Sequence, residues 1–188
     1  MSTTTEVIIS GFGGQGALFA GQVLAYAALD TGRYVTWIPS YGPEMRGGTA
    51  RCTVVVSDEE IGSPIVRRPS SAIVLNIPSM ESFEPAVAPG GVLVVNSSLV
   101  DLTSQRDDLT AVYVDATELA TEMGNARVGN MILLGAWAVA TGVVTVEQLT
   151  QAVADHLPSE RQRLVPINQQ ALRRGAEVAR AQLKVLAA

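Results

Sequence analysis

Lysine, cysteine and histidine occur only once each in this 188-residue chain, as Lys184, Cys52 and His156. A lone cysteine cannot close an internal disulfide or hold an iron–sulfur cluster by itself, and a lone histidine provides no metal site. The only lysine lies near the C-terminus, so no phosphate-loop or Schiff-base lysine stands near the glycine-rich turn described below. No Ser/His/Asp set is spaced for nucleophilic catalysis. We therefore expect a chain that carries little chemistry of its own, with Cys52 as an inert core thiol and His156 at the surface or at a helix end.

Charged residues are also scarce. They make up 16% of the chain, whereas hydrophobic residues make up 47%, and about 25% charged is usual for a soluble domain. A surface so poor in charge predicts that part of it is covered by another subunit, through homodimer contacts or within a larger complex. The formal net charge of −5 argues against a phosphate-backbone partner, so we expect no nucleic acid.

No apolar stretch reaches the roughly 18–20 residues that cross a bilayer, so we expect no membrane span. Residues 1–5 have neither a basic start nor an apolar segment of the secretory type. A cytoplasmic location is the resulting expectation.

The most informative stretch is the glycine-rich turn Gly11-Phe-Gly13-Gly14-Gln15-Gly16, which follows the apolar run Val7–Ile9 and opens a helical pattern at Ala17. This strand, turn and helix order is the context in which G-x-G-x-x-G has meaning. Glycines bring the backbone close to a ligand, and the helix N-terminus offers free N–H groups and a positive dipole end. An anionic group is therefore expected here, although a turn that only packs the helix on the strand is about as frequent.

A dinucleotide site would need an acidic residue at the end of the second strand. That strand, residues 34–39, ends instead in Ile38-Pro39-Ser40. Asp30 precedes the strand and Glu44 follows it in a loop. The sequence therefore argues against NAD as the ligand.

The loop after this strand reads Ser40-Tyr41-Gly-Pro-Glu44-Met-Arg46-Gly-Gly48. Loops at the carboxyl ends of neighbouring strands share a crevice in an open parallel sheet, so this loop and the glycine turn should face each other. Tyr41 offers a hydroxyl, Glu44 a carboxylate, and Arg46 a forked cation suited to phosphate or carboxylate. The alternative is a solvated loop with one Glu–Arg pair.

The remaining pattern predicts an α/β fold: a single Rossmann-like domain with a mostly parallel sheet flanked by helices and a helical C-terminal part. A β-hairpin of residues 52–56 with 61–66 would interrupt the alternation of strands with helices, so we expect a mixed sheet. The predicted strands are residues 6–10, 34–39, 50–56, 72–77, 92–96 and 112–115. The predicted helices are residues 17–31, 117–123, 128–140, 146–155 and 167–186, with a short one starting near residue 78.

Three segments together carry a family resemblance: the glycine turn 11–16, the nine-residue loop 40–48, and Ile61-Gly-Ser-Pro64. With Val94–Ser98 and Gly129–Gly135, they resemble the gamma subunit of 2-oxoacid:ferredoxin oxidoreductases over about residues 6–180. The resemblance is closer to the 2-oxoglutarate or branched-chain 2-ketoacid type than to the indolepyruvate type. It implies that residues 1–188 form one gamma-type catalytic domain.

The resemblance also implies an activity. The complex would oxidatively decarboxylate a 2-oxoacid, with 2-oxoglutarate or 2-ketoisovalerate favoured over pyruvate, and pass electrons to ferredoxin. Thiamine diphosphate and iron–sulfur clusters would belong to alpha, beta and ferredoxin-like delta subunits, while this chain would help to form the site and handle coenzyme A. The residues expected to border the shared site are Gly11, Gly13, Gly14, Gln15, Gly16, Ser40, Tyr41, Glu44 and Arg46. The alternative from another class is a stand-alone nucleotide or acyl-CoA binding module.

Overall fold

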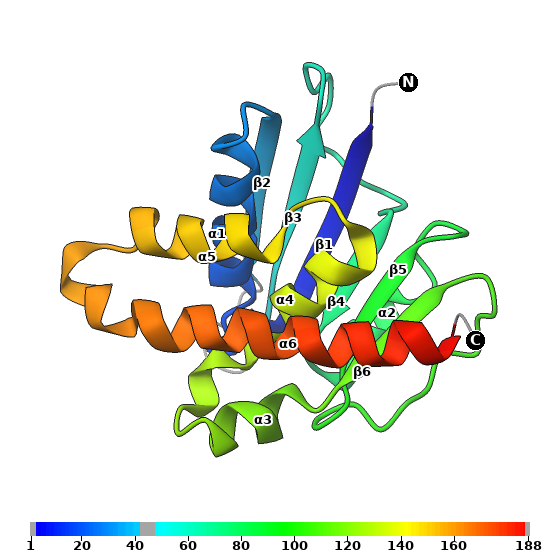
Figure 1. The fold of residues 1–188 in the computed structure, drawn as a ribbon. Coiled ribbons are helices and arrows are strands. Elements are labelled where there is room, and N and C mark those ends of the chain that lie inside the picture. Colours follow the sequence, from blue (N-terminus) through cyan, green and yellow to red (C-terminus); the bar gives the residue numbers. More distant parts are fainter. Residues whose placement is uncertain (1–2, 42–47, 187–188) are drawn as a thin grey trace.

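The computed structural model describes residues 3–41 and 48–186 (Figure 1). They form a six-stranded sheet in the order β2-β3-β1-β4-β5-β6. Only β3 runs antiparallel to its neighbours, and the pairs β1–β4, β4–β5 and β5–β6 are parallel. The strand bounds are β1 Thr4–Phe12, β2 Tyr34–Tyr41, β3 Thr49–Ser57, β4 Ser71–Val74, β5 Val92–Asn96 and β6 Thr110–Val114. The expectation of a mostly parallel but mixed sheet is confirmed.

Helices cover both faces of this sheet. In Figure 1, α1, α4, α5 and α6 lie in front of the strands, and α2 lies behind them. The helix bounds are α1 Ala17–Leu29, α2 Ile77–Phe83, α3 Ala116–Glu122, α4 Gly129–Thr141, α5 Val146–His156 and α6 Val165–Leu186. Two short 3-10 helices, η1 Ala126–Val128 and η2 Ser159–Leu164, precede α4 and α6.

Strand alternation explains how one sheet supports two cores. Successive side chains of a strand point to opposite faces, so Val7 and Ile9 of β1 pack with the front helices, whereas Ile8 packs with α2. The central strands β1, β4 and β5 are largely buried on both faces, which is why they read as continuous apolar runs rather than as alternating ones.

Helix α4 is buried on most sides, as its sequence predicts, and it packs closely against α6. A Cβ at Gly135 would lie 2.0 Å from the Leu172 carbonyl oxygen, and one at Gly175 would lie 1.7 Å from that of Ile132. Each helix therefore has a glycine where the other's backbone passes. The buried Trp137 donates its indole N–H to the Ser71 hydroxyl at 2.9 Å, which joins α4 to β4.

Two expectations about strands are wrong. Residues 61–66 form no strand, and β3 pairs with β2 and β1 instead. Gly62 and Pro64 within that short run disfavour a strand, whereas β2 supplies a long apolar partner. The second strand also does not stop at Pro39 but continues to Tyr41. Since β2 is an edge strand, a proline is tolerated wherever its missing N–H faces away from the partner.

The sequence predicts the starts of α1 and α5 more accurately than the strand pairing. Thr145 and Gln148 form the expected capping box at the start of α5, with both reciprocal bonds present. The start of α2 is an exception, because the predicted strand 72–77 ends at Val74 and Asn76 caps α2 instead, accepting from the Ser79 N–H at 2.9 Å. Helix α1 begins at Ala17 directly after Gly16, and Gly32 beyond its end has φ +83°. These signals are local, so neighbouring residues are sufficient to fix them.

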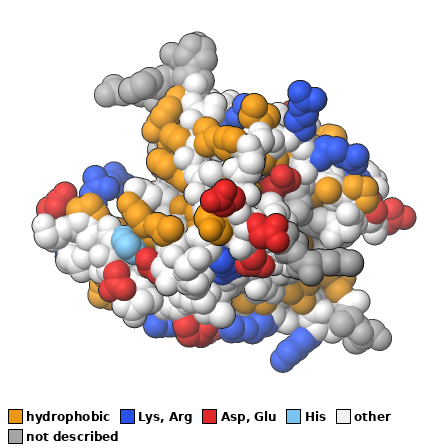
Figure 2. Space-filling model, turned by 90° about the horizontal axis from the view of Figure 1, so that it is seen from above, with side chains coloured by type: hydrophobic (Ala, Val, Ile, Leu, Met, Phe, Trp, Pro, Cys, Tyr) orange, Lys and Arg blue, Asp and Glu red, His pale blue; other side chains and the backbone are white. Residues whose placement is uncertain are grey.

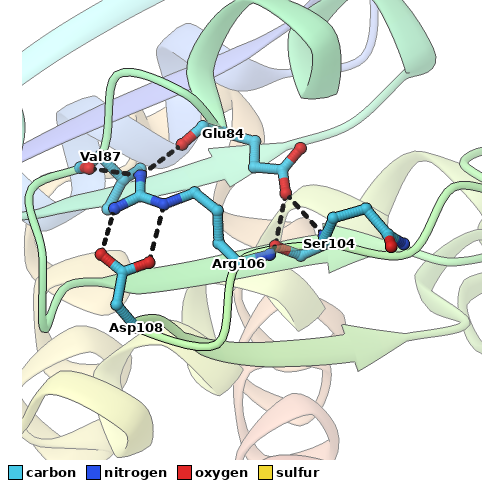
Figure 3. A network of polar contacts seen from close by, with 6 residues as sticks. Glu84, Val87, Ser104, Arg106 and Asp108 are labelled. Carbon is cyan, nitrogen blue, oxygen red and sulfur yellow. Dashed lines mark hydrogen bonds and ion pairs between the residues drawn. The ribbon is translucent and has the colours of Figure 1, made fainter.

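The segment between β5 and β6 is held by a network around Arg106 (Figure 3). One guanidinium nitrogen donates to the carbonyl oxygens of Glu84 at 3.0 Å and Val87 at 2.6 Å. The other two nitrogens donate to the Asp108 carboxylate at 2.9 and 2.5 Å. The Glu84 carboxylate also accepts from the Ser104 hydroxyl. This segment is thereby tied to the end of α2.

Figure 2 views the end of the molecule that is uppermost in Figure 1, and both signs of charge are interspersed with hydrophobic side chains there. Within residues 3–41 and 48–186, no helix is both long and apolar enough to cross a bilayer.

Candidate functional site

The glycine turn lies at the end of β1, where the chain must reverse into α1. Gly14 and Gly16 have φ values of +97° and +80°, a region that L side chains rarely adopt. The Gln15 N–H closes the turn by donating to the Phe12 carbonyl oxygen at 3.1 Å. These two glycines are therefore needed for the backbone path itself.

The start of α1 carries no side-chain cap. The Ala20 N–H donates to the Gly16 carbonyl oxygen at 3.0 Å, and no side chain caps the helix at Gly16. The N–H groups of the first turn, at Ala17, Leu18 and Phe19, have no intrahelical acceptor. No acidic residue occupies this turn, so the positive end of the helix dipole is not offset locally.

The Gln15 side chain, which is expected from the sequence at the ligand site, forms hydrogen bonds within the protein. Its side-chain oxygen accepts from the Phe12 N–H at 2.6 Å, and its amide donates to the Leu75 carbonyl oxygen at 3.3 Å. The Asn76 amide donates to the Gln15 side-chain oxygen at 3.3 Å. The side chain therefore links the ends of β1 and β4.

Asn130, at the start of α4, fixes the other end of the turn. Its amide donates to the Gly16 carbonyl oxygen at 2.9 Å, and its side chain is only 5% exposed. A Cβ at Gly16 would lie 2.5 Å from that same amide nitrogen. Glycine at position 16 is thus required by the turn and by the close approach of α4.

A cavity of about 360 Å³ opens where the glycine turn meets the strands on either side of residues 42–47. Its lining residues are Phe12, Gly13, Gly14, Gly16, Ala17, Leu18, Phe19, Tyr41, Gly48, Thr49 and Ala50. The Gly13 N–H donates to the Gly48 carbonyl oxygen at 2.9 Å, so the turn and the end of the loop are in contact. We call this space the glycine-turn cavity.

A second cavity of about 480 Å³ adjoins Tyr41 and Thr49 on the side of α2, and hydroxyl groups dominate its lining. The lining residues are Ser10, Ser40, Tyr41, Thr49, Arg51, Pro78, Ser79, Ser82 and Phe83. The Ser79 hydroxyl donates to that of Ser10 at 2.9 Å. The guanidinium carbon of Arg51 lies 5.7 Å from the centre of the Phe83 ring, where it makes a cation–π contact.

The structure brings together part of the predicted site. Gly13, Gly14, Gly16 and Tyr41 line the glycine-turn cavity, whereas Ser40 lines the second cavity. Gly11 lines neither cavity, and a Cβ there would meet Gln15 and Leu75 at 2.6 and 2.9 Å. Glu44 and Arg46 lie outside the described residues. Whether these residues contact a ligand stays a prediction.

Sequence reasoning missed Phe12, Phe19 and Arg51 as lining residues. Phe12 occupies a variable position of the glycine motif, and Phe19 reads as an ordinary apolar residue of α1. The sequence does contain a signal that Arg51 lines a site, because it is the only charged residue in strand β3, whose other residues are apolar or carry hydroxyl groups.

Cys52 and His156 behave as expected from the sequence. Cys52 is fully buried, its thiol donates to the Ala17 carbonyl oxygen at 3.4 Å, and burial raises its pKa to about 12. A thiol with such a pKa stays protonated and unreactive at neutral pH. His156 ends α5, pairs with Asp30 at 2.8 Å and stacks on Tyr26.

No group of three or more His, Cys, Asp or Glu side chains within the described ranges is arranged to hold a metal ion. The chemistry that the described cavities offer is therefore recognition through backbone N–H groups, hydroxyl groups and one guanidinium.

Comparison with known proteins gives a consistent result. The model of the family described as pyruvate ferredoxin/flavodoxin oxidoreductase matches residues 6–178. Among curated relatives, the ketoisovalerate oxidoreductase subunit VorA of Methanothermobacter marburgensis is 38% identical over 95% of this chain. The 2-oxoglutarate synthase subunit KorC of the same organism is 38% identical over 81% of the chain and 86% of its own length.

The VorA relative is considerably longer, since the matched part of this chain spans 37% of it. Among solved structures, the gamma subunit of a keto/oxoacid ferredoxin oxidoreductase from Geobacter sulfurreducens superposes with a TM-score of 0.79. It is 30% identical, and the match covers 94% of this chain and 99% of that one. The fold and the sequence thus agree on the same relatives.

Proposed function

Because the chain belongs to the pyruvate ferredoxin/flavodoxin oxidoreductase family, we propose that it is the gamma subunit of a 2-oxoacid:ferredoxin oxidoreductase. The observation that supports this most is a match of sequence and fold along nearly the whole chain to a gamma subunit of that class. The proposed complex oxidises a 2-oxoacid to the acyl-CoA and passes the electrons to ferredoxin. Alpha, beta and delta subunits are its proposed partners.

The proposed substrate is 2-oxoglutarate or 2-ketoisovalerate rather than pyruvate. Relatives named for each of the first two substrates share 38% identity with this chain. Equal identity to both favours neither over the other, so the substrate class is proposed as these two together.

For this chain itself we propose a part in handling coenzyme A at the glycine-turn cavity. The N–H groups at the start of α1 suit a phosphate oxygen, because they are donors at the positive end of a helix dipole. Phe12, Leu18 and Tyr41 provide apolar wall beside them. Coenzyme A, when bound, supplies the thiol that receives the acyl group. Glu44 and Arg46 are proposed to border the same site.

The single cysteine, Cys52, is buried and cannot hold an iron–sulfur cluster by itself. The clusters and thiamine diphosphate are proposed to reside on partner subunits. The role of this chain is then to bind, to orient and to shield the site from water.

Gly14→Ala in the assembled complex tests the coenzyme A proposal. Gly14 lines the cavity at φ +97°, so an added methyl strains the turn that presents the N–H groups. Gly32→Ala is a matched control, since Gly32 has φ +83°, open space around it and no place in the glycine-turn cavity. We expect the KM for coenzyme A to rise about tenfold in the first variant, the loss of roughly one good hydrogen bond. Equal KM values in both variants would contradict the proposal.

The stand-alone binding module remains the second candidate, and its support is the same glycine-turn cavity. Co-purification separates the two functions. A tagged chain that retains thiamine-binding and cluster-binding subunits supports the oxidoreductase, whereas a chain that binds acyl-CoA while remaining alone supports the module.

A further inference from the structure

A third cavity, of about 430 Å³, lies where α1, η1, η2 and the start of α6 meet. Arg127, Arg161 and Arg163 all line it, and no acidic side chain of the described residues does. We call it the arginine cavity. It shares only Phe19 with the glycine-turn cavity, so it is a separate space on the same side of α1.

The three arginines bring positive charge to one space. None forms an ion pair with an acidic side chain of the described residues. Other arginines of the described residues, such as Arg33 and Arg180, also form no ion pair. What distinguishes these three is that they line one cavity. Three like charges around one space repel one another, and an anion between them would remove that repulsion.

The floor of the cavity is held in place by buried amides. Asn130 and Asn168 are 5% and 6% exposed. Their side chains donate to the carbonyl oxygens of Gly16 at 2.9 Å and Leu164 at 2.7 Å. These bonds tie the cavity floor to the glycine turn and to η2, so its shape is set by packing rather than by exposed side chains alone.

The backbone that carries the arginines is also fixed. The Arg127 N–H donates to the Asn125 side-chain oxygen at 3.1 Å, which caps η1. The Arg161 N–H donates to the Pro158 carbonyl oxygen at 2.8 Å. The Gln162 amide donates to the Leu157 carbonyl oxygen at 2.6 Å. All three guanidinium groups therefore start from ordered turns that face one cavity.

We propose that the arginine cavity binds a small molecule through its phosphate groups. Planar guanidinium groups match phosphate oxygens in paired hydrogen bonds, and their charge does not depend on pH in the physiological range. A volume of about 430 Å³ lies within the usual range for small-molecule pockets, and it exceeds the space that a single phosphate needs. A concave site of this kind suits a diphosphate better than the flat surface of a protein partner.

A smaller cavity of about 170 Å³ adjoins the arginine cavity as an extension, and the two share the lining residues Phe19, Leu157 and Arg161. The stacked rings of Tyr26 and His156, with centres 4.1 Å apart, line this extension. Both inorganic diphosphate and the diphosphate of a nucleotide have the chemistry proposed here. The aromatic extension gives the nucleotide an additional contact surface.

Calorimetry on the purified full chain tests the proposal, with pyrophosphate and ADP as probes in low-salt buffer. We expect both to bind, and each of Arg127→Gln, Arg161→Gln and Arg163→Gln to weaken binding about tenfold, the usual effect of one charge-assisted contact. If ADP binds more tightly than pyrophosphate, the ligand is a nucleotide. If the two bind equally, the site recognises the diphosphate alone. Either result supports the site. The matched control is Arg180→Gln, an exposed arginine of α6 that lines none of these cavities.

Three results would overturn the inference. The first is the absence of binding for both probes at about 5 mM, since three guanidinium groups around one phosphate site should give at least millimolar affinity. The second is an equal loss of affinity in Arg180→Gln, which would indicate attraction by overall charge. The third is unchanged affinity when all three arginines are replaced together. Circular dichroism of each variant shows that the fold is kept, which is expected because the three arginines are exposed.

Discussion

Replacing Gly16 by alanine should destabilise the domain through two separable effects. The first is backbone strain, because φ at Gly16 is +80° and an L residue there costs about 1–2 kcal/mol. The second is displacement of Asn130, whose amide nitrogen would lie 2.5 Å from the new methyl. Losing the Asn130–Gly16 hydrogen bond adds about 0.5–1.5 kcal/mol. We therefore expect Gly16→Ala to lower the free energy of unfolding by roughly 1.5–3.5 kcal/mol, the sum of the two effects.

Urea unfolding of three further variants isolates each effect. Gly32→Ala, with φ +83° and open space around its Cβ, should show the strain alone. Asn130→Ala removes the amide without changing φ, so Gly16→Ala on that background should cost only as much as Gly32→Ala. The double-mutant cycle then gives a coupling energy of about 1 kcal/mol between positions 16 and 130. Equal destabilisation by Gly16→Ala and Gly32→Ala, with no coupling, would refute the reasoning.

Three other predictions follow from single features. The isolated chain should show no calorimetric binding of NAD at micromolar concentrations, because β2 from Tyr34 to Tyr41 contains no acidic residue; micromolar binding would contradict this. Cys52 should resist thiol reagents at pH 8 until urea unfolds the chain, and rapid labelling of the native chain would disprove this. The free energy of unfolding should fall as pH rises from 9.0 towards about 12, because only the unfolded thiol ionises in this range. Arg106→Ala should lower the urea midpoint at pH 7. Because the Arg106 guanidinium lowers the pKa of Asp108 below 3.8, this difference should shrink as acid protonates that carboxylate; a pH-independent difference would refute the ion-pair account.

How far the sequence predicts this structure depends on how local each signal is. The turn before α1 and the Thr145 capping box require only adjacent residues, and both form as expected. The partner of β3 is a different case, because pairing with β1 and β2 is decided by residues far away in the chain. A hairpin with residues 61–66 looked plausible only because that run lies next to β3 in the sequence.

In the candidate site, too, the contacts between residues distant in the chain are harder to predict than local turns. The glycine turn and the loop end are in contact as predicted, but for another reason than neighbouring parallel strands. The Gly13–Gly48 hydrogen bond continues the antiparallel pairing of β1 with β3, in which Phe12 pairs with Thr49. The hydrogen bond from the Gln15 side chain to the Leu75 carbonyl oxygen could not be predicted, because Leu75 follows β4, which is far from Gln15 in the sequence. The arginine cavity could not be predicted from the sequence either, since Arg127 and Arg163 come together only because η1 and η2 both pack against α6.

The proposed function is tested most directly by reconstitution. A complex prepared without this chain is assayed for reduction of ferredoxin that depends on a 2-oxoacid and coenzyme A, before and after the purified chain is added. With 2-oxoglutarate and 2-ketoisovalerate tried in parallel, we expect one of them to drive reduction only when the chain is present. Full activity in its absence, or no stable association with the other subunits, would contradict its role as the gamma subunit.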